Sequence, residues 1–330
     1  MSFKILKNKK YLITGGSGFI GTNLINNLIH YSNQIINIDI NKPKINSHKN
    51  FWIKLDINNY DELNKICNKF RPDYIVNLAA TTDLNGKNLN YYKTNFKGVE
   101  NLIRCSLNLK NLKKILFFSS RLVCKIGYQP KNFKDYCPST IYGKSKVLGE
   151  KILNSKKYNN FKKWSNIRVT SLWGPWFDVP YKNFFLIIKR ELYFKPTNGK
   201  IYKSFGYVEN SIFQIKKLLI SNKIYTQKKN FYLADFEPIE IDKFANKIAN
   251  TFNSSKPKNI PFFILNLGAI FGDFLKLFKI SFPITTFRLN NLRTNMIHDI
   301  SDLKKITGPL PCSIDTGIKK TVKWINKYNA

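Results

Sequence analysis

A glycine-rich turn near the start of the chain constrains the fold more than any other feature. Gly15, Gly18 and Gly21 lie three residues apart in the run YLITGGSGFIG, between a strand-like apolar stretch and a stretch of helical periodicity. This spacing allows a tight turn, lets a pyrophosphate approach the backbone, and lets the helix pack against the strand. The helix start, at Phe19 and Ile20, would direct free N–H groups toward the phosphates. The turn therefore predicts a dinucleotide-binding unit.

Short β-rich runs alternate with helical stretches through the first half of the chain, as in a parallel sheet covered by helices. Beyond Gly174 and Pro175 the alternation weakens, and short helices are separated by turns rich in Pro, Asn and Gly. We therefore predict an α/β fold. It comprises a Rossmann-type doubly wound parallel sheet in residues 1–175, with later segments crossing back, and a smaller C-terminal α/β lobe, mainly substrate-binding, in residues 176–330.

The second predicted strand ends at Asp39, 18 residues after Gly21. A carboxylate at this position accepts hydrogen bonds from the ribose hydroxyls of adenosine and repels a 2′-phosphate. No Arg follows Asp39 within the turn. These residues favour NAD over NADP as the cofactor.

A tyrosine and a lysine on a later predicted helix have the spacing of a proton-transfer pair. Tyr142 and Lys146 lie four residues apart in YGKSK, so they share a helix face. An ammonium there stabilises a phenolate and lowers the tyrosine pKa from about 10 toward the working pH. The strand ILFFSS ends 22 residues upstream of Tyr142 and brings hydroxyls to the sheet edge where ligands of such folds bind. A serine there is placed to hydrogen-bond the substrate oxygen that Tyr142 protonates or deprotonates.

Charge and cysteine content bear on partners. The chain has 55 Lys+Arg against 20 Asp+Glu, a formal charge of +35, and 43% hydrophobic residues, which excludes general disorder. The Lys are scattered, and Lys, Asn and Ile are favoured by AT-rich codons, so we expect genome composition to explain the charge and expect no specific nucleic-acid partner. Weak association with an acidic membrane surface stays open. Five Cys without close pairs and three separated His predict no disulfide framework and no metal site.

The most apolar stretch runs from Ile260 to Ile280 and is interrupted by Asn266, Asp273 and Lys276. Its uninterrupted part falls short of the about 20 residues of a spanning helix. We predict an amphipathic helix beneath the substrate lobe, with a helix lying on a membrane surface as the alternative. The basic N-terminus runs straight into a strand without a signal-peptide pattern, so a cytoplasmic location is expected.

Together these motifs resemble the nucleotide-sugar epimerase/dehydratase family of extended short-chain dehydrogenases/reductases over nearly the whole chain. The family's TGxxGxxG turn is Thr14–Gly21, and its His-Leu-Ala-Ala motif is matched by NLAA, with Asn77 in place of His. Its Ser-Ser-x-x-Val-Tyr-Gly motif is SSRLVC, which places the active hydroxyl at Ser120. The resemblance implies catalysis by Ser120, Tyr142 and Lys146. NAD contacts are expected at Gly15, Gly18, Phe19, Ile20, Gly21, Asp39, Asp56, Ile57, Leu78, Ala79, Ala80, Asn95, Tyr142 and Lys146. Substrate contacts are expected at Thr81, Arg121, Ser171, Trp173, Lys203 and Arg293.

One departure from the family narrows the expected chemistry. Sugar dehydratases and decarboxylases of this kind carry carboxylates just after the active hydroxyl, where this chain has Arg121 and Leu122. The resemblance therefore implies an NAD-dependent 4-epimerase of a nucleotide-diphosphate sugar, serving surface polysaccharide or glycan precursor synthesis, with a homodimer expected by analogy. A nucleotide-sugar dehydrogenase or keto-reductase, or a sterol-type alcohol dehydrogenase, is the first alternative. A non-catalytic NAD-sensing or RNA-associated protein is the second.

Overall fold

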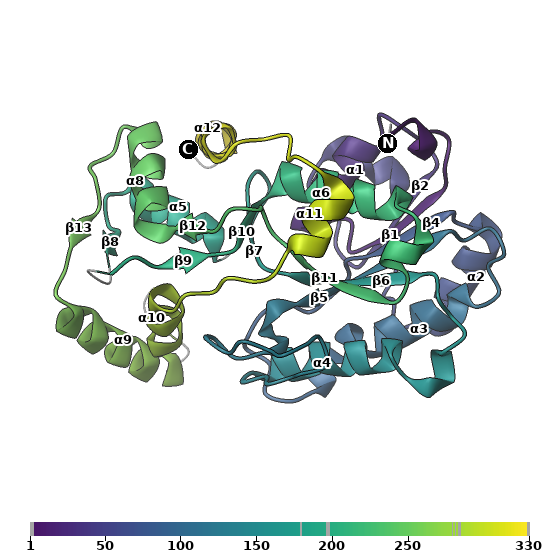
Figure 1. The fold of residues 1–330 in the computed structure, drawn as a ribbon, viewed down its shortest axis with the longest axis horizontal. Helices are drawn as coiled ribbons and strands as arrows, with labels where there is room; N and C mark the ends of the chain where they lie inside the picture. The colour runs from purple at the N-terminus through teal and green to yellow at the C-terminus, as the bar shows by residue number, and fades with distance from the viewer. Residues whose placement is uncertain are drawn as a thin grey trace.

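A seven-stranded parallel sheet forms the centre of the computed structural model, which describes residues 3–178, 180–195, 199–278, 280, 282 and 285–328. The strand order is β11-β6-β5-β4-β1-β2-β3 (Figure 1). The strands are β1 (Tyr11–Thr14), β2 (Ile35–Asp39), β3 (Trp52–Lys54), β4 (Tyr74–Asn77), β5 (Lys114–Ser120), β6 (Trp164–Val169) and β11 (Lys229–Leu233). The chain order reverses between β1 and β4, which opens a crevice at the carboxyl ends of the strands. The predicted Rossmann-type α/β fold is confirmed.

Helices cover both faces of this sheet, so its central strands β1, β4 and β5 are buried on both sides. Tyr11 and Ile13 of β1 pack into one core, and Leu12 between them packs into the other. The helices of the first layer are α1 (Phe19–Leu28), α6 (Val208–Ile220) and α11 (Ser301–Thr307). The helices of the second layer are α2 (Tyr60–Phe70), α3 (Lys97–Ser106) and α4 (Ile141–Leu153).

In the C-terminal region two helices pack on the fully buried Trp173 through Phe185 and Phe244, and three two-stranded sheets are added. Its helices are α5 (Tyr181–Lys189), α7 (Lys223–Thr226), α8 (Ile241–Phe252), α9 (Phe262–Leu277), α10 (Thr286–Arg293) and α12 (Ile314–Tyr328). The paired strands are β7 (Ser171–Trp173) with β10 (Phe205–Tyr207), β9 (Tyr202–Lys203) with β12 (Ile239–Glu240), and β8 (Phe194–Lys195) with β13 (Lys258–Asn259). Short 3-10 helices are η1 (Phe3–Leu6), η2 (Asn46–Phe51), η3 (Asn90–Asn95), η4 (Arg121–Val123) and η5 (Lys156–Tyr158).

The apolar segment from Ile260 to Ile280 contains the expected helix, α9, but the exposed side of this helix is apolar instead of polar. Figure 1 shows α9 and α10 at the end of the molecule opposite the central sheet. Leu265 and Ala269 are buried, whereas most of the other large apolar side chains of α9 are exposed. In the part of the chain that the structure describes, no helix has the length and apolar character required to cross a bilayer.

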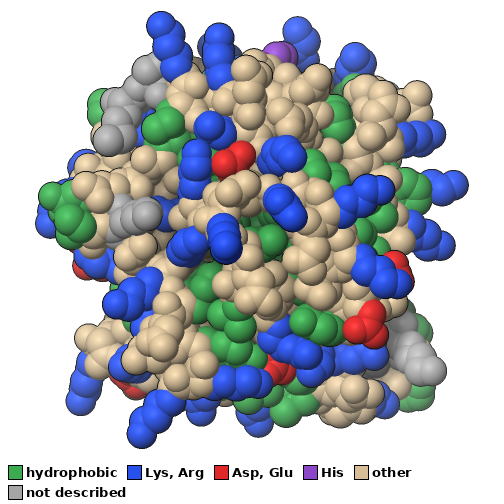
Figure 2. Space-filling model, turned by 90° about the vertical axis from the view of Figure 1, so that its right-hand side faces the viewer, with side chains coloured by type: hydrophobic (Ala, Val, Ile, Leu, Met, Phe, Trp, Pro, Cys, Tyr) green, Lys and Arg blue, Asp and Glu red, His purple; other side chains and the backbone are tan. Residues whose placement is uncertain are grey.

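Basic side chains are spread over the surface. Figure 2 shows the end of the molecule built from the central sheet, where Lys and Arg project from many places and acidic side chains are sparse. This distribution agrees with the scattered positions of Lys in the sequence. The overall charge therefore does not by itself single out a binding face on this end.

Candidate active site

A cleft of about 800 Å³ lies at the carboxyl ends of the strands, between the sheet and the C-terminal region. Its wall includes most of the residues expected to contact a dinucleotide, together with all three expected catalytic residues. Those expected residues are Gly15, Gly18, Phe19, Ile20, Gly21, Asp39, Asp56, Ile57, Leu78, Ala79, Ala80, Ser120, Tyr142 and Lys146. The sequence motifs, which are spread over more than one hundred residues, thus meet in one cavity.

The glycine turn is packed too tightly for side chains. Gly15 has a φ of +71°, and a Cβ there would lie 2.5 Å from the backbone nitrogen of Ala79 at the end of β4. A Cβ on Gly21 would lie 2.4 Å from the Cα of Gly16. Gly18 is the N-cap of α1 and supplies no side-chain cap, so the N–H groups of the first turn are open to an anion.

Asp39 ends β2 next to this turn and already holds it in place. Its carboxylate accepts hydrogen bonds from the backbone N–H of Ser17 (3.0 Å) and of Asn41 (2.9 Å). A carboxylate accepts about four hydrogen bonds, so capacity is left for ribose hydroxyls. Asp56 lies exposed at the rim, where its Oδ1 accepts from the N–H of Asn58 at 2.9 Å.

Asn95, expected to contact the cofactor, instead lies behind the cleft wall. Its side chain is 1% exposed and bonds the backbone N–H and C=O of Thr81, at 3.0 and 2.9 Å. Its amide nitrogen also donates to the hydroxyl of Ser145 on α4, at 2.9 Å. Asn95 is therefore a positioning residue that ties the loop after β4 to the helix carrying Tyr142.

Asn77, where the family has His, is also buried. Its Oδ1 accepts a hydrogen bond from the hydroxyl of Thr14 at 2.6 Å. The Thr14 oxygen in turn accepts from the N–H of Ala79 at 3.3 Å. Asn77 thus joins β1 to β4 beside the glycine turn, with a compact amide side chain where the family has the imidazole ring of His.

Ser120, Tyr142 and Lys146 converge at the centre of the cleft. Thr140 caps α4 by accepting a hydrogen bond from the N–H of Gly143 at 2.9 Å, which fixes the turn that carries Tyr142. The Tyr142 side chain faces Ser120 at the end of β5, close enough for the serine to lower the tyrosine pKa. The Lys146 ammonium donates to the C=O of Phe118 at 3.0 Å and lies 6.0 Å from the Tyr142 ring centroid. A phenol, an alcohol and an ammonium therefore face one volume.

Burial shifts both titratable groups toward their neutral forms. It raises the pKa of Tyr142 to about 12, although the hydrogen bond to Ser120 and the charge of Arg121 act in the opposite direction. Burial also lowers the pKa of Lys146 to about 8, against the opposing influence of Glu150. The expected lowering of the Tyr142 pKa is therefore not met in the protein alone, because desolvation outweighs the effects of Ser120 and Arg121.

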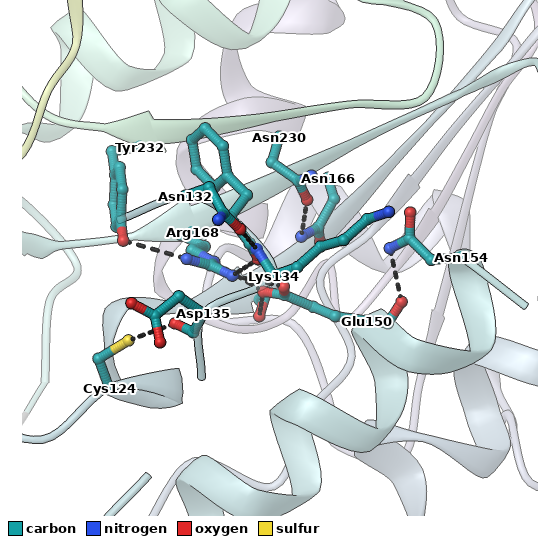
Figure 3. A network of polar contacts seen from close by, with 12 residues as sticks. Cys124, Asn132, Lys134, Asp135, Glu150, Asn154, Asn166, Arg168, Asn230 and Tyr232 are labelled. Carbon is teal, nitrogen blue, oxygen red and sulfur yellow. Dashed lines mark hydrogen bonds and ion pairs between the residues drawn. The ribbon is translucent and has the colours of Figure 1, made fainter. Parts of the chain in front are cut away.

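A buried ion pair supports this helix from behind (Figure 3). Glu150 lies two turns after Tyr142 on α4, and its carboxylate accepts from Arg168 Nε (2.9 Å) and Nη2 (2.8 Å). It also accepts from the hydroxyl of Ser119 at 2.6 Å, while Arg168 donates to the Tyr232 hydroxyl at 3.1 Å. The side chains of Glu150 and Arg168 are 1% and 0% exposed. This network fixes α4 against β5 and β6, and sequence reasoning missed Glu150.

Two cations lie near the part of the cleft left for a substrate. Arg121 lines the cleft, and its Nη2 donates to the side-chain oxygen of Asn291 at 3.4 Å. The buried Lys203 donates to the same oxygen at 3.3 Å and to the C=O of Thr294 at 2.9 Å. Among the described residues, neither cation has a carboxylate within ion-pair distance. Burial and the charge of Arg121 lower the pKa of Lys203 to about 7.

The remaining expected substrate residues divide into one that lines the cleft and three that do not. Thr81 lies in the wall. The expectation for Trp173 is corrected, because it is fully buried between Phe185, Tyr207 and Phe244 in the core. Ser171 is buried and bonds the hydroxyl of Tyr181, and Arg293 stacks on Phe262 with 3.7 Å between guanidinium and ring centroid. These side chains are occupied by packing within the C-terminal region.

Sequence reasoning also missed wall residues that come from distant segments. Phe287 and Asn291, one turn apart on α10, line the cleft from the C-terminal side. Lys44 lines its outer part and forms an ion pair with Asp178 at 3.3 Å, joining the two sides of the opening. The four-residue spacing of Phe287 and Asn291 in the sequence is that of two residues on one helix face. Nothing in the local sequence indicates that this helix, α10, reaches the cleft.

The sequence of this chain is similar to those of known proteins. A model of the NAD dependent epimerase/dehydratase family matches residues 11–198. Protein CapI of Staphylococcus aureus is 24% identical over 286 residues, covering 76% of this chain and 85% of that protein. The N-acetyl-alpha-D-glucosaminyl-diphospho-ditrans,octacis-undecaprenol 4-epimerase of Escherichia coli O157:H7 is 24% identical over 332 residues, covering 96% of this chain and 95% of that protein.

A solved structure shares the whole architecture. The UDP-glucose 4-epimerase of Thermotoga maritima, crystallised with UDP-glucose, superposes with a TM-score of 0.74 at 19% identity. The match covers 97% of this chain and 100% of that chain. At this level of identity the superposition establishes a common fold, including the C-terminal region.

Proposed function

We propose that this chain, which belongs to the NAD dependent epimerase/dehydratase family, is an NAD-dependent 4-epimerase of a nucleotide-diphosphate sugar. One observation carries the proposal: Ser120, Tyr142 and Lys146 converge in the cleft that also contains the glycine turn. A hydroxyl pair beside a dinucleotide site suits reversible oxidation of a sugar alcohol.

The residues of the cleft suit NAD. When bound there, NAD would accept a hydride from the sugar carbon and later return it. The cleft runs along Gly15 and Gly18, where α1 begins, so a diphosphate bound there would meet backbone N–H groups. Asp39 would hold the adenosine ribose and disfavour a 2′-phosphate. Lys146 would hold the second ribose, since its ammonium is fixed by the C=O of Phe118 within the cleft.

Tyr142 would remove the proton from the sugar hydroxyl as the ring carbon is oxidised. It would return the proton after the keto sugar has rotated in the site to present its other face. Ser120, which lines the cleft beside Tyr142, would hold the same sugar oxygen in line. Because burial disfavours the phenolate in the protein alone, the cationic groups that line the filled cleft must supply the opposing charge. Closure of the C-terminal region over the sugar would keep water from the keto intermediate.

Arg121 and Lys203 would face the acidic part of the substrate. Both lie against Asn291, and among the described residues neither has a carboxylate partner. Positive charge without a counter-ion in a partly buried site favours an anionic ligand such as a diphosphate. Arg121 also occupies the place where elimination would need a carboxylate, which supports epimerisation over dehydration.

The test is to identify the retained cofactor by mass spectrometry and to incubate the protein with a panel of UDP-, GDP- and dTDP-sugars. Retained NAD and isomer interconversion without net NADH are expected. Tyr142→Phe should lower turnover by at least about 100-fold, since general acid–base groups contribute this much or more. The matched control is Tyr225→Phe, because Tyr225 is 60% exposed on α7, away from the cleft lining.

Two outcomes would contradict the proposal. Stoichiometric NADH would identify a dehydrogenase. Turnover of Tyr142→Phe within about tenfold of the unmodified protein would remove Tyr142 from proton transfer.

A second candidate substrate is a sugar carried on a polyprenyl diphosphate. The E. coli relative is named as an epimerase of such a lipid-linked sugar. The observation that favours it here is the exposed apolar surface of α9, which packs on α10 next to the cleft. Including undecaprenyl-diphosphate N-acetylglucosamine in the panel separates the two candidates, because only one class should be interconverted efficiently.

A further inference from the structure

Helix α9 carries a row of exposed apolar side chains outside the cleft. Between residues 262 and 280, ten large hydrophobic side chains are 39% to 79% exposed: Phe262, Phe263, Ile264, Leu267, Ile270, Phe271, Phe274, Leu277, Phe278 and Ile280. Those at 263, 267, 270, 271, 274, 277 and 278 recur at helical spacing, and we call them the apolar face of α9. Contiguous exposed patches of this kind mark interaction sites.

The opposite side of α9 is already anchored. Leu265 and Ala269 pack with Leu289 of α10 in a small separate core. Asp273 accepts a hydrogen bond from the N–H of Thr286 at 3.2 Å, at the start of α10. The helix is therefore held by its inner side, and its apolar face is left for an external surface.

The sequence around α9 is rich in basic residues. From residue 256 to residue 293 the sequence has a single acid, Asp273, against six cations: Lys256, Lys258, Lys276, Lys279, Arg288 and Arg293. The Asp273 carboxylate is directed to α10 by its bonds to Thr286. Apolar side chains bordered by cations complement an anionic lipid surface. A second copy of a chain with a charge of +35 would bring like charge against like.

We propose that the apolar face of α9 docks on the surface of an anionic lipid bilayer, with the helix lying in the plane of the interface. The 16 residues of α9 span about 24 Å at 1.5 Å per residue, less than the about 30 Å hydrocarbon core. The apolar side chains enter the acyl boundary, and the flanking cations contact the headgroups.

Docking would place the mouth of the cleft near the membrane. Helix α10 contributes Phe287 and Asn291 to the cleft wall and Leu289 to the contact with α9. The surface that meets the lipid is therefore one helix away from the site. The inference goes beyond the proposed function, because turnover of a water-soluble nucleotide sugar does not require it.

The experiment is co-sedimentation of the full chain with vesicles of phosphatidylcholine alone or of an equimolar mixture with phosphatidylglycerol. Binding to the anionic vesicles is expected, weakening as salt is added. Leu267→Glu combined with Phe274→Glu should lower the partition coefficient by at least about tenfold, since two large apolar side chains are removed from the lipid contact. Ile224→Glu is the matched control, because Ile224 is 78% exposed on α7.

Far-UV circular dichroism and turnover of a soluble sugar substrate verify that the double variant is folded, and both should be unchanged. The proposal is overturned if the full chain ignores anionic vesicles, or if the double variant binds them as well as the Ile224→Glu control. It is also overturned if analytical ultracentrifugation finds a dimer that the double variant abolishes, because a second copy then covers the face. Loss of epimerase activity with intact vesicle binding would contradict only the proposed function.

Discussion

Glu150→Gln tests how strongly the buried ion pair behind the active site stabilises the protein. The Glu150 carboxylate accepts two hydrogen bonds from Arg168 and one from Ser119, and both charged side chains are at most 1% exposed. Gln has nearly the same shape but carries no charge, and its amide nitrogen donates where the carboxylate accepted. The substitution therefore leaves the Arg168 guanidinium buried without a counter-charge.

The size of the destabilisation follows from the burial of the Glu150 and Arg168 side chains, which are at most 1% exposed. Removing one member of a buried ion pair costs about 3–5 kcal/mol, because the remaining charge stays desolvated. The lost Ser119 bond belongs to the same network, so its contribution is not simply added. We expect the free energy of unfolding to fall by about 3–5 kcal/mol, a large share of the about 5–15 kcal/mol typical of a domain.

Urea unfolding followed by circular dichroism at neutral pH measures this difference. Asp315→Asn is the matched control, since it removes the charge from an exposed ion pair with Lys247 that also links two helices. Its unfolding curve should coincide with that of the unmodified protein. Glu150→Met combined with Arg168→Met should recover much of the loss, because no charge is left buried. A Glu150→Gln midpoint equal to that of Asp315→Asn would refute the reasoning.

Three further predictions concern the turn, a buried acid and the active-site lysine. Gly15→Ala should abolish NAD retention, because Gly15 has a φ of +71° and a Cβ at this position would clash with Ala79. The control is Gly268→Ala on α9, where a Cβ meets open space, so the substitution should be stabilising or neutral. Equal NAD content in the two variants would contradict the prediction. Burial raises the pKa of Asp235 to about 7, so between about pH 4 and 7 the folded state keeps a proton that the unfolded state releases. The free energy of unfolding should therefore fall as pH rises through this range. In Asp235→Asn the urea midpoint should no longer show this dependence on pH. Because burial lowers the pKa of Lys146 to about 8, kcat/KM should decline above that pH, and a flat alkaline profile would count against its role.

The central sheet and the cofactor turn were predictable because their signals are local. The strands β1, β4 and β5 are short runs buried along their whole length, and the glycine spacing indicates a turn without room for Cβ atoms. Tyr142 and Lys146 were predictable for the same reason, since four residues of helix place them on one face. Ser120 needed the family motif, because the strand pattern alone did not distinguish it from Ser119.

Residues whose roles depend on tertiary contacts were not predictable. Glu150 is matched with Arg168 from a different element, and a Glu on a helix normally faces solvent. Asn291 reaches the cleft only because α10 folds back from a distant part of the chain. Trp173 illustrates the reverse error, since an aromatic residue beside a ligand motif also serves as the centre of a core.

The electrostatics of the site show why the number of cations was a poor guide to its chemistry. The chain carries a charge of +35, yet two lysines in or beside the cleft, Lys146 and Lys203, are buried, and burial lowers the pKa of each, to about 8 and about 7. Their charge near neutral pH therefore depends on what fills the cleft, whereas exposed Lys stay charged regardless. An anionic substrate would raise both pKa values on binding, so the site carries more positive charge when it is occupied. Such coupling of charge to ligand requires desolvation, which a folded cleft creates and a sequence composition does not.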